Sequence, residues 1–135
     1  MIQPGGSFRE EFSRLVKAMG RWRDTEPDAL LALWATFVEQ CEQGYSGEAE
    51  DYFNDLTVRA DLEKAMTDAG LQKFPELAQL RAVVVTLDER FRALLLPDAF
   101  PRMQNWWARG VVKSAKRRLV EELRRDFHIE GMEVK

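Results

Sequence analysis

The chain has 135 residues, of which 45% are hydrophobic and 32% charged, and its formal net charge is −3. A chain of this length fits one domain and can bury a core without a disulfide or a metal ion. The single cysteine, Cys41, excludes an intrachain disulfide and favours a reducing compartment. The longest mostly apolar stretch, 29–38, is too short for the roughly 20 residues of a membrane span. The N-terminus also lacks the pattern of a signal peptide. We therefore expect one cytoplasmic domain over 1–135, with 1–6 and 129–135 as loose ends and no membrane partner.

Helix signals run through the first half of the chain. Ser7 and Glu10 form a predicted capping box ahead of an apolar stripe, which indicates a helix over about 8–19. Pro27 stands in the first turn of a second helix that ends near Gly44. The apolar stripe of this second helix is broad, as is typical of a central helix buried on most sides.

Further helices are predicted over 48–56, over 58–69 and from Pro75 to about residue 94, where apolar residues recur in steps of three and four. Pro101 opens a last helical region that reaches Phe127. Gly110 either breaks this region into two helices or only weakens it. The predicted fold class is all-α, a compact bundle of five to seven helices.

Charge is distributed unevenly along the chain. Residues 24–98 carry sixteen acids and six bases, whereas residues 109–125 carry seven bases and two acids. Such asymmetry concerns the partners of a protein and not its fold.

The acidic middle of the chain predicts a protein-binding role. Between residues 39 and 55 there are six acids and no base, with tyrosines between them, and such a surface can attract a basic partner quickly. Immunity proteins that neutralise basic bacterial toxins work in this way, and this is our leading hypothesis. The predicted partner-binding residues are Glu39, Glu42, Tyr45, Glu48, Glu50, Asp51, Tyr52 and Asp55.

The basic C-terminal region supports an alternative, nucleic-acid binding, because a stripe of cations can follow phosphates. Trp106 and Trp107 precede this stripe and could stack on bases if they are exposed. The overall acidity of the chain weighs against this alternative. Its candidate residues are Lys113, Lys116, Arg117, Arg118 and Arg124.

A second alternative is a Mg-dependent nucleotide hydrolase. Its candidate carboxylates are the pair Glu39 and Glu42 and the series Glu48, Asp51 and Asp55, because magnesium prefers oxygen ligands. No cluster of cations stands near them to hold phosphates. His128 is the only histidine, and Cys41 lies on an apolar stripe, so neither indicates a catalytic site. The sequence therefore favours a non-enzymatic protein and predicts no catalytic residue, metal ligand or cofactor.

Three segments carry a resemblance to known proteins: Tyr52–Arg59 with the pattern Asn-Asp-Leu-x-x-Arg, Leu87–Arg92 with Leu-Asp-Glu-Arg-Phe, and the pair Trp106-Trp107. In this order they resemble a group of small bacterial proteins of unassigned function. The resemblance implies no activity. It does imply a polar cluster that would bring together Asp55, Arg59, Asp88, Arg90 and Trp107.

Overall fold

The computed structural model of the protein describes residues 7–135, so the expectation for 1–6 lies outside it. Within this range the chain is mostly helical, which confirms the predicted all-α bundle. The helices are α1 (Phe8–Ala18), α2 (Pro27–Gln43), α3 (Ala49–Asp55), α4 (Thr57–Thr67), the 3-10 helix η1 (Ala69–Leu71), α5 (Glu76–Arg92), α6 (Trp106–Arg109) and α7 (Arg117–Phe127).

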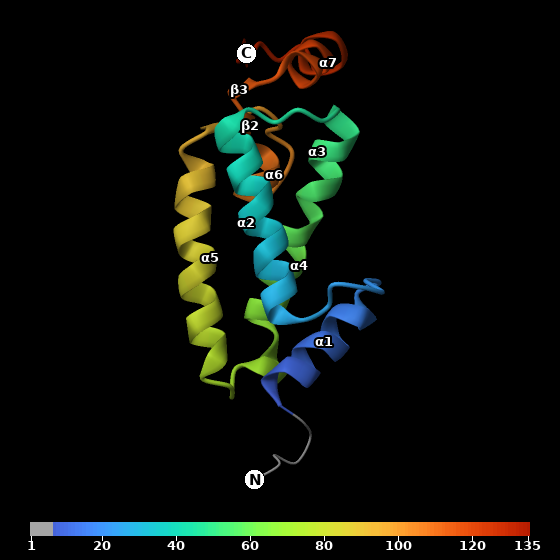
Figure 1. Cartoon of the computed structure of the whole chain (residues 1–135), viewed down its shortest axis with the longest axis vertical. Helices are drawn as coiled ribbons and strands as arrows, with labels where there is room; N and C mark the ends of the chain where they lie inside the picture. Colours follow the sequence, from blue (N-terminus) through green and yellow to red (C-terminus); the bar gives the residue numbers. More distant parts are fainter. Residues whose placement is uncertain (1–6) are drawn as a thin grey trace.

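Helices α2 and α5 run side by side along the long axis of the molecule, with α4 packed against α2 (Figure 1). Helix α1 lies at one end of this pair and α7 at the other. The aromatic centre consists of Trp34 and Phe37 from α2, Tyr52 from α3 and Phe91 from α5, all with almost no exposed surface. Because aromatic side chains bury large areas, this cluster supplies much of the hydrophobic driving force.

The local signals at the helix ends agree with the sequence. The Ser7 side chain accepts from the Glu10 N–H, and the Glu10 carboxylate accepts from the Ser7 N–H, which confirms the capping box of α1. Pro27 opens α2, and Gly44 ends it with φ +101°. That backbone conformation favours glycine because it lacks a Cβ.

The segment between α5 and α7 differs from the expectation of a helical region starting at Pro101. Only α6 is helical there, with one short strand before it and two after it. Strand β1 (Leu95–Leu96) pairs antiparallel with β2 (Val111–Val112). Val111 and Val112 are buried, and β-branched side chains suit such a pairing. A Cβ on Gly110 would stand only 3.0 Å from the Leu96 carbonyl oxygen, so this glycine permits the close approach of β1.

The segment 129–135, expected as a loose end, contains a short strand and is largely exposed. Strand β3 (Ser114–Ala115) pairs parallel with β4 (Met132–Glu133). The Val134 N–H donates to the Ala115 carbonyl at 2.8 Å, and Ile129 packs against the core. Among the described helices, none is long and apolar enough to cross a membrane.

Candidate functional site

The predicted acidic surface occupies the end of α2, the α2–α3 loop and α3. Its two tyrosines are in the core, with Tyr52 fully buried and Tyr45 nearly so. They cannot serve as exposed anchors for a partner, and that part of the prediction is wrong. The sequence pattern misled because both side chains face inward, toward the Phe37 ring.

The buried tyrosines have a positioning role. The Tyr45 hydroxyl donates to the Asp55 carboxylate at 2.7 Å, and the Tyr52 hydroxyl accepts from the Val112 N–H at 3.3 Å. Burial raises the pKa of both hydroxyls, and the Asp55 carboxylate raises the pKa of Tyr45 further. These bonds fix α3 against the end of α2 and against β2.

Two acids of the predicted set are already neutralised. The Arg90 guanidinium donates to Glu42 at 2.5 and 3.0 Å, and this hydrogen bond lowers the pKa of the Glu42 carboxyl. Arg118 lies 3.2 Å from Glu48. Within residues 7–135 the other four acids make no ion pair, and these are Glu39, Glu50, Asp51 and Asp55.

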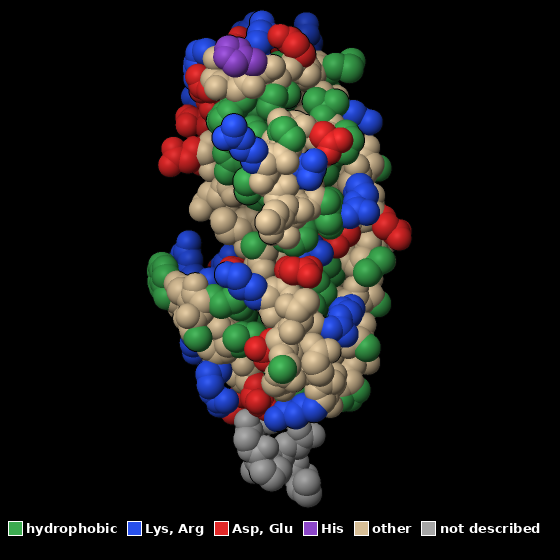
Figure 2. All heavy atoms as spheres, turned by 180° about the vertical axis from the view of Figure 1, so that it is seen from behind, with side chains coloured by type: hydrophobic (Ala, Val, Ile, Leu, Met, Phe, Trp, Pro, Cys, Tyr) green, Lys and Arg blue, Asp and Glu red, His purple; other side chains and the backbone are tan. Residues whose placement is uncertain are grey.

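A cleft of about 440 Å³ lies between α2 and the α3–α4 segment. Thr36 and Gln40 line it from α2, Asn54 and Asp55 from α3, and the buried Phe37 ring contributes an apolar surface. In Figure 2 the molecule is hollowed where the lobe of the α1–α2 loop stands off from the elements above it.

A smaller hollow of about 290 Å³ continues the cleft toward the α2–α3 loop, because Gln40 and Asp55 line both. Asp51 lines only the smaller hollow. We name the two together the α2–α3 groove. Its end at Asp51 and Asp55 is acidic, and the charges at its other end balance, because Arg21 lies 2.9 Å from Asp61 and Arg23 lies 3.9 Å from Asp24.

Trp22, which the sequence analysis did not single out, lies in the chain between two residues that line this second end of the groove. Its side chain is 81% exposed, and the Arg23 guanidinium lies 5.0 Å from the ring centroid. The neighbours Arg21 and Arg23 both line the groove. The available signal was an Arg-Trp-Arg sequence in the loop between two helices, with the tryptophan outside either apolar stripe.

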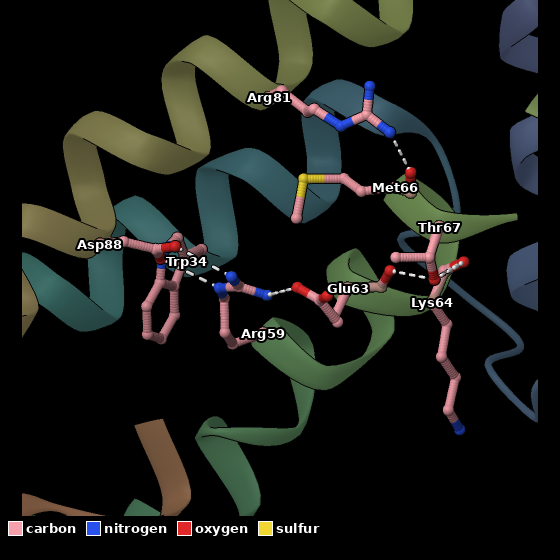
Figure 3. A network of polar contacts seen from close by, with 8 residues as sticks. All are labelled: Trp34, Arg59, Glu63, Lys64, Met66, Thr67, Arg81 and Asp88. Carbon is pink, nitrogen blue, oxygen red and sulfur yellow. Dashed lines mark hydrogen bonds and ion pairs between the residues drawn. The ribbon is translucent and has the colours of Figure 1, made fainter. Parts of the chain in front are cut away.

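The predicted polar cluster forms in part. Arg59 donates twice to Asp88, from Nε and Nη2 at 2.9 Å each, and Trp34 Nε1 donates to the same carboxylate at 3.1 Å (Figure 3). The Arg59 guanidinium also lies 4.2 Å from the Trp107 ring centroid and 3.0 Å from Glu63. This cluster joins α2, α4, α5 and α6, and the sequence did not indicate the part of Trp34 or Glu63.

Asp55 and Arg90 lie outside the cluster, so these two members of the prediction are wrong. Asp55 ends α3 and Leu56 interrupts the helix, so Asp55 does not meet Arg59 four residues on. Arg90 instead bonds to Glu42, and Arg92 stacks 4.0 Å from the Trp106 ring centroid.

The basic residues near the C-terminus do not form one helical stripe. Lys113 lies between β2 and β3, and Lys116 is the N-cap of α7. Three arginines of α7 each have a carboxylate close by: Arg117 has Glu121, Arg118 has Glu48, and Arg124 has Glu130. The positive field available to phosphates is therefore smaller than the sequence count suggests.

Other candidate groups give little support to an enzyme. His128 caps the exposed end of α7. Burial raises the pKa of the Cys41 thiol, which disfavours the nucleophilic thiolate. Across residues 7–135 no group of three His, Cys, Asp or Glu side chains is arranged to hold a metal ion.

A scan against protein-family models finds no match to this chain, and searches of curated proteins and of solved structures find none either. The function is therefore argued from the geometry of the α2–α3 groove alone.

Proposed function

We propose that this protein is a non-enzymatic binding module whose α2–α3 groove receives a basic segment of another protein. The observation that carries the proposal is the acidic end of the groove, where Asp51 and Asp55 line a hollow and make no ion pair. Carboxylates without a counter-ion raise the local concentration of cations and speed the association of a basic partner.

The lining of the groove suits a peptide segment. Gln40 and Asn54 place amide groups on opposite walls, and amides can both donate to and accept from a peptide backbone. Thr36 and Thr57 add hydroxyls, while Leu33, which is 38% exposed, offers an apolar contact. Trp22 adds an exposed aromatic side chain beside the groove, and tryptophan is enriched among the residues that dominate binding energy.

In its sharpest form, the module is an immunity-type inhibitor that acts in the bacterial cytoplasm and neutralises a basic toxin. The unpaired acids support this form because toxin inhibitors of this kind rely on steered electrostatic association. The paired arginines of α7 weigh against nucleic-acid binding as the main role. Co-expression with a toxin encoded beside this gene tests the sharper form by restored growth.

A defined peptide tests the groove itself. We would titrate the protein with a fluorescently labelled 14-residue Lys-rich peptide and measure polarisation at low salt. The variant Asp51→Asn/Asp55→Asn removes the two negative charges that line the acidic end, while the introduced amide oxygens can still accept from the Glu48 N–H and the Tyr45 hydroxyl. We expect this variant to bind the peptide about tenfold more weakly, since each lost charge contact contributes roughly 1 kcal/mol or less.

A matched control uses acids of α5 that lie outside the groove. The variant Glu76→Gln/Glu89→Gln removes the same number of negative charges but leaves the groove intact. Equal weakening in both double variants would show that only overall charge attracts the peptide and would overturn the proposal.

A further inference from the structure

A second groove lies on the other side of the α3–α4 segment. Its volume is about 410 Å³, and its lining is mainly apolar. Phe53 and Ala60 line it from α3 and α4, and Phe100, Met103 and Trp107 line it from the chain before and within α6. We name it the α3–α6 groove. Figure 2 views the molecule from the side of α6 and shows hydrophobic side chains with Lys and Arg side chains beside them.

Three phenylalanines form a triangle beside this groove. The ring centroids of Phe53, Phe100 and Phe127 lie 5.5 to 5.7 Å apart, with all three pairs edge to face. Phe127 is 41% exposed and Met103 is 48% exposed. Contiguous apolar groups on a surface mark interaction sites more often than scattered ones do.

Two cations, Lys64 and Arg102, stand close in the chain to residues that line the α3–α6 groove. Lys64 lies one turn beyond Ala60 on the same face of α4, and in Figure 3 its side chain points away from the Arg59–Asp88 pair. Arg102 precedes Met103. Neither cation makes an ion pair with residues 7–135. The acids close in the chain to lining residues or to Phe127 are Glu50, Asp61, Asp98 and Asp126. The last three are paired with Arg21, Arg109 and Arg125.

The shape favours a helix as the occupant. One wall runs from Phe53 near the end of α3 to Thr57 and Ala60 of α4, beyond the interruption at Leu56. A partner helix would place two or three apolar side chains over this length. No strand lines the groove, so an extended segment would leave its own backbone groups without partners.

We propose that the α3–α6 groove binds an amphipathic helix of a partner protein, with apolar side chains in the groove and acidic side chains against Lys64 and Arg102. This inference does not rest on the α2–α3 groove, because apart from Thr57 it concerns other residues, and the charge involved is the opposite one. Together the two grooves would let the α3–α4 segment hold segments of opposite charge on its two sides.

Two synthetic peptides test the inference on the full-length protein. The first is an 18-residue helix former with leucines on one face and glutamates on both flanks, and the second has lysine in place of every glutamate. Fluorescence polarisation measures both affinities. We expect the glutamate peptide to bind more tightly and to lose about tenfold or more in affinity with Met103→Glu, which places a charge in the groove.

Lys64→Glu should lower the affinity of the glutamate peptide several-fold and raise that of the lysine peptide. Met132→Glu is the matched control, because Met132 is 70% exposed and does not line the groove, and it should change neither affinity. Thermal unfolding would check that each variant is folded.

Three results would overturn the inference. The glutamate peptide could fail to bind, the lysine peptide could bind equally well, or Met103→Glu could leave the affinity unchanged. If sedimentation shows a dimer that Met103→Glu dissociates while neither peptide binds, the groove is a self-association surface instead.

Discussion

Trp22 is 81% exposed, which favours the proposed binding role over a structural one. Because its ring buries little surface in the fold, Trp22→Ala should leave the unfolding temperature nearly unchanged. The same variant should bind the Lys-rich peptide about tenfold more weakly, as expected when an aromatic contact of the partner is truncated.

Trp22→Phe serves as the conservative control and should retain most of the affinity. Intrinsic fluorescence gives a second measurement, because Trp34 and Trp107 are buried and Trp22 is the most exposed tryptophan. Peptide binding should therefore shift the emission of the wild type to shorter wavelength and not that of Trp22→Phe. If Trp22→Ala binds as well as the wild type, the anchor role is wrong.

Arg59 is a buried cation, and the Asp88 carboxylate should contribute more than Glu63 to the stability of the fold around it. Asp88→Asn keeps the shape but leaves the guanidinium without its main counter-charge, so we expect a loss of about 3 kcal/mol in the free energy of unfolding. The Glu63 side chain is 41% exposed, and Glu63→Gln should cost less than about 1 kcal/mol. Urea denaturation followed by circular dichroism measures both, and equal losses would contradict this ranking.

At the scale of elements, Gly44 at the end of α2 lies against Val134, the residue that follows strand β4. A Cβ at Gly44 would overlap the Val134 side chain, and the positive φ adds strain for any other residue. Gly44→Ala should therefore destabilise the protein by clearly more than about 1 kcal/mol and expose the amides of 132–135 to faster hydrogen exchange.

Gly20→Ala separates these two causes. Gly20 has a similar φ of +108°, but nothing lies within 4 Å of its Cβ position. This variant should show only the cost of the strained backbone, with unchanged exchange at 132–135. If the two variants behave alike, the contact with Val134 does not hold the C-terminal strand.

The sequence predicted those elements whose signals are local. Capping residues and the three-four apolar spacing located α1, α2 and α5, because these features act within one or two turns of a helix. The β1–β2 and β3–β4 pairings were not predicted, since strands of two residues are too short to show a period. Their partners also lie far along the chain, where no local pattern reports them.

The sequence predicted the acidic character of the candidate site but not the groove or the orientation of the side chains around it. The count of acids indicated an acidic surface, but composition cannot show that Tyr45 and Tyr52 face inward or that Arg90 neutralises Glu42. The role of Trp22 depends on which loop stands off from the bundle, and this is decided by tertiary packing.

For the whole molecule, the buried hydroxyls and the thiol predict steep loss of stability in alkali. Tyr45, Tyr52 and Cys41 all have a raised pKa in the folded state because burial disfavours their anions. Unfolded cysteine and tyrosine ionise near pH values of about 8.5 and 10, so above these values the unfolded state binds fewer protons than the native state. The stabilisation from these protonated groups is therefore fully present below a pH of about 8.5, and the free energy of unfolding falls as the pH rises.

Each group should contribute a slope of about 1.4 kcal/mol per pH unit above its unfolded pKa. Urea denaturation between pH 8 and 11.5 measures this slope, and tyrosine absorbance should change together with unfolding. Tyr45→Phe should reduce the slope by the contribution of one titrating group. A flat stability profile up to pH 11 would contradict the burial of these groups.

Thr57 lines both the α2–α3 groove and the α3–α6 groove, so one helical wall serves both. Any shift of this wall that improves the fit on one side alters the fit on the other. Thermodynamic linkage then requires that each ligand change the affinity of the other by the same factor. The factor by which the Lys-rich peptide changes the affinity for the glutamate helix equals the factor by which that helix changes the affinity for the peptide. If both proposed ligands bind, the occupancy of one groove would be transmitted to the other through a displacement of this single wall.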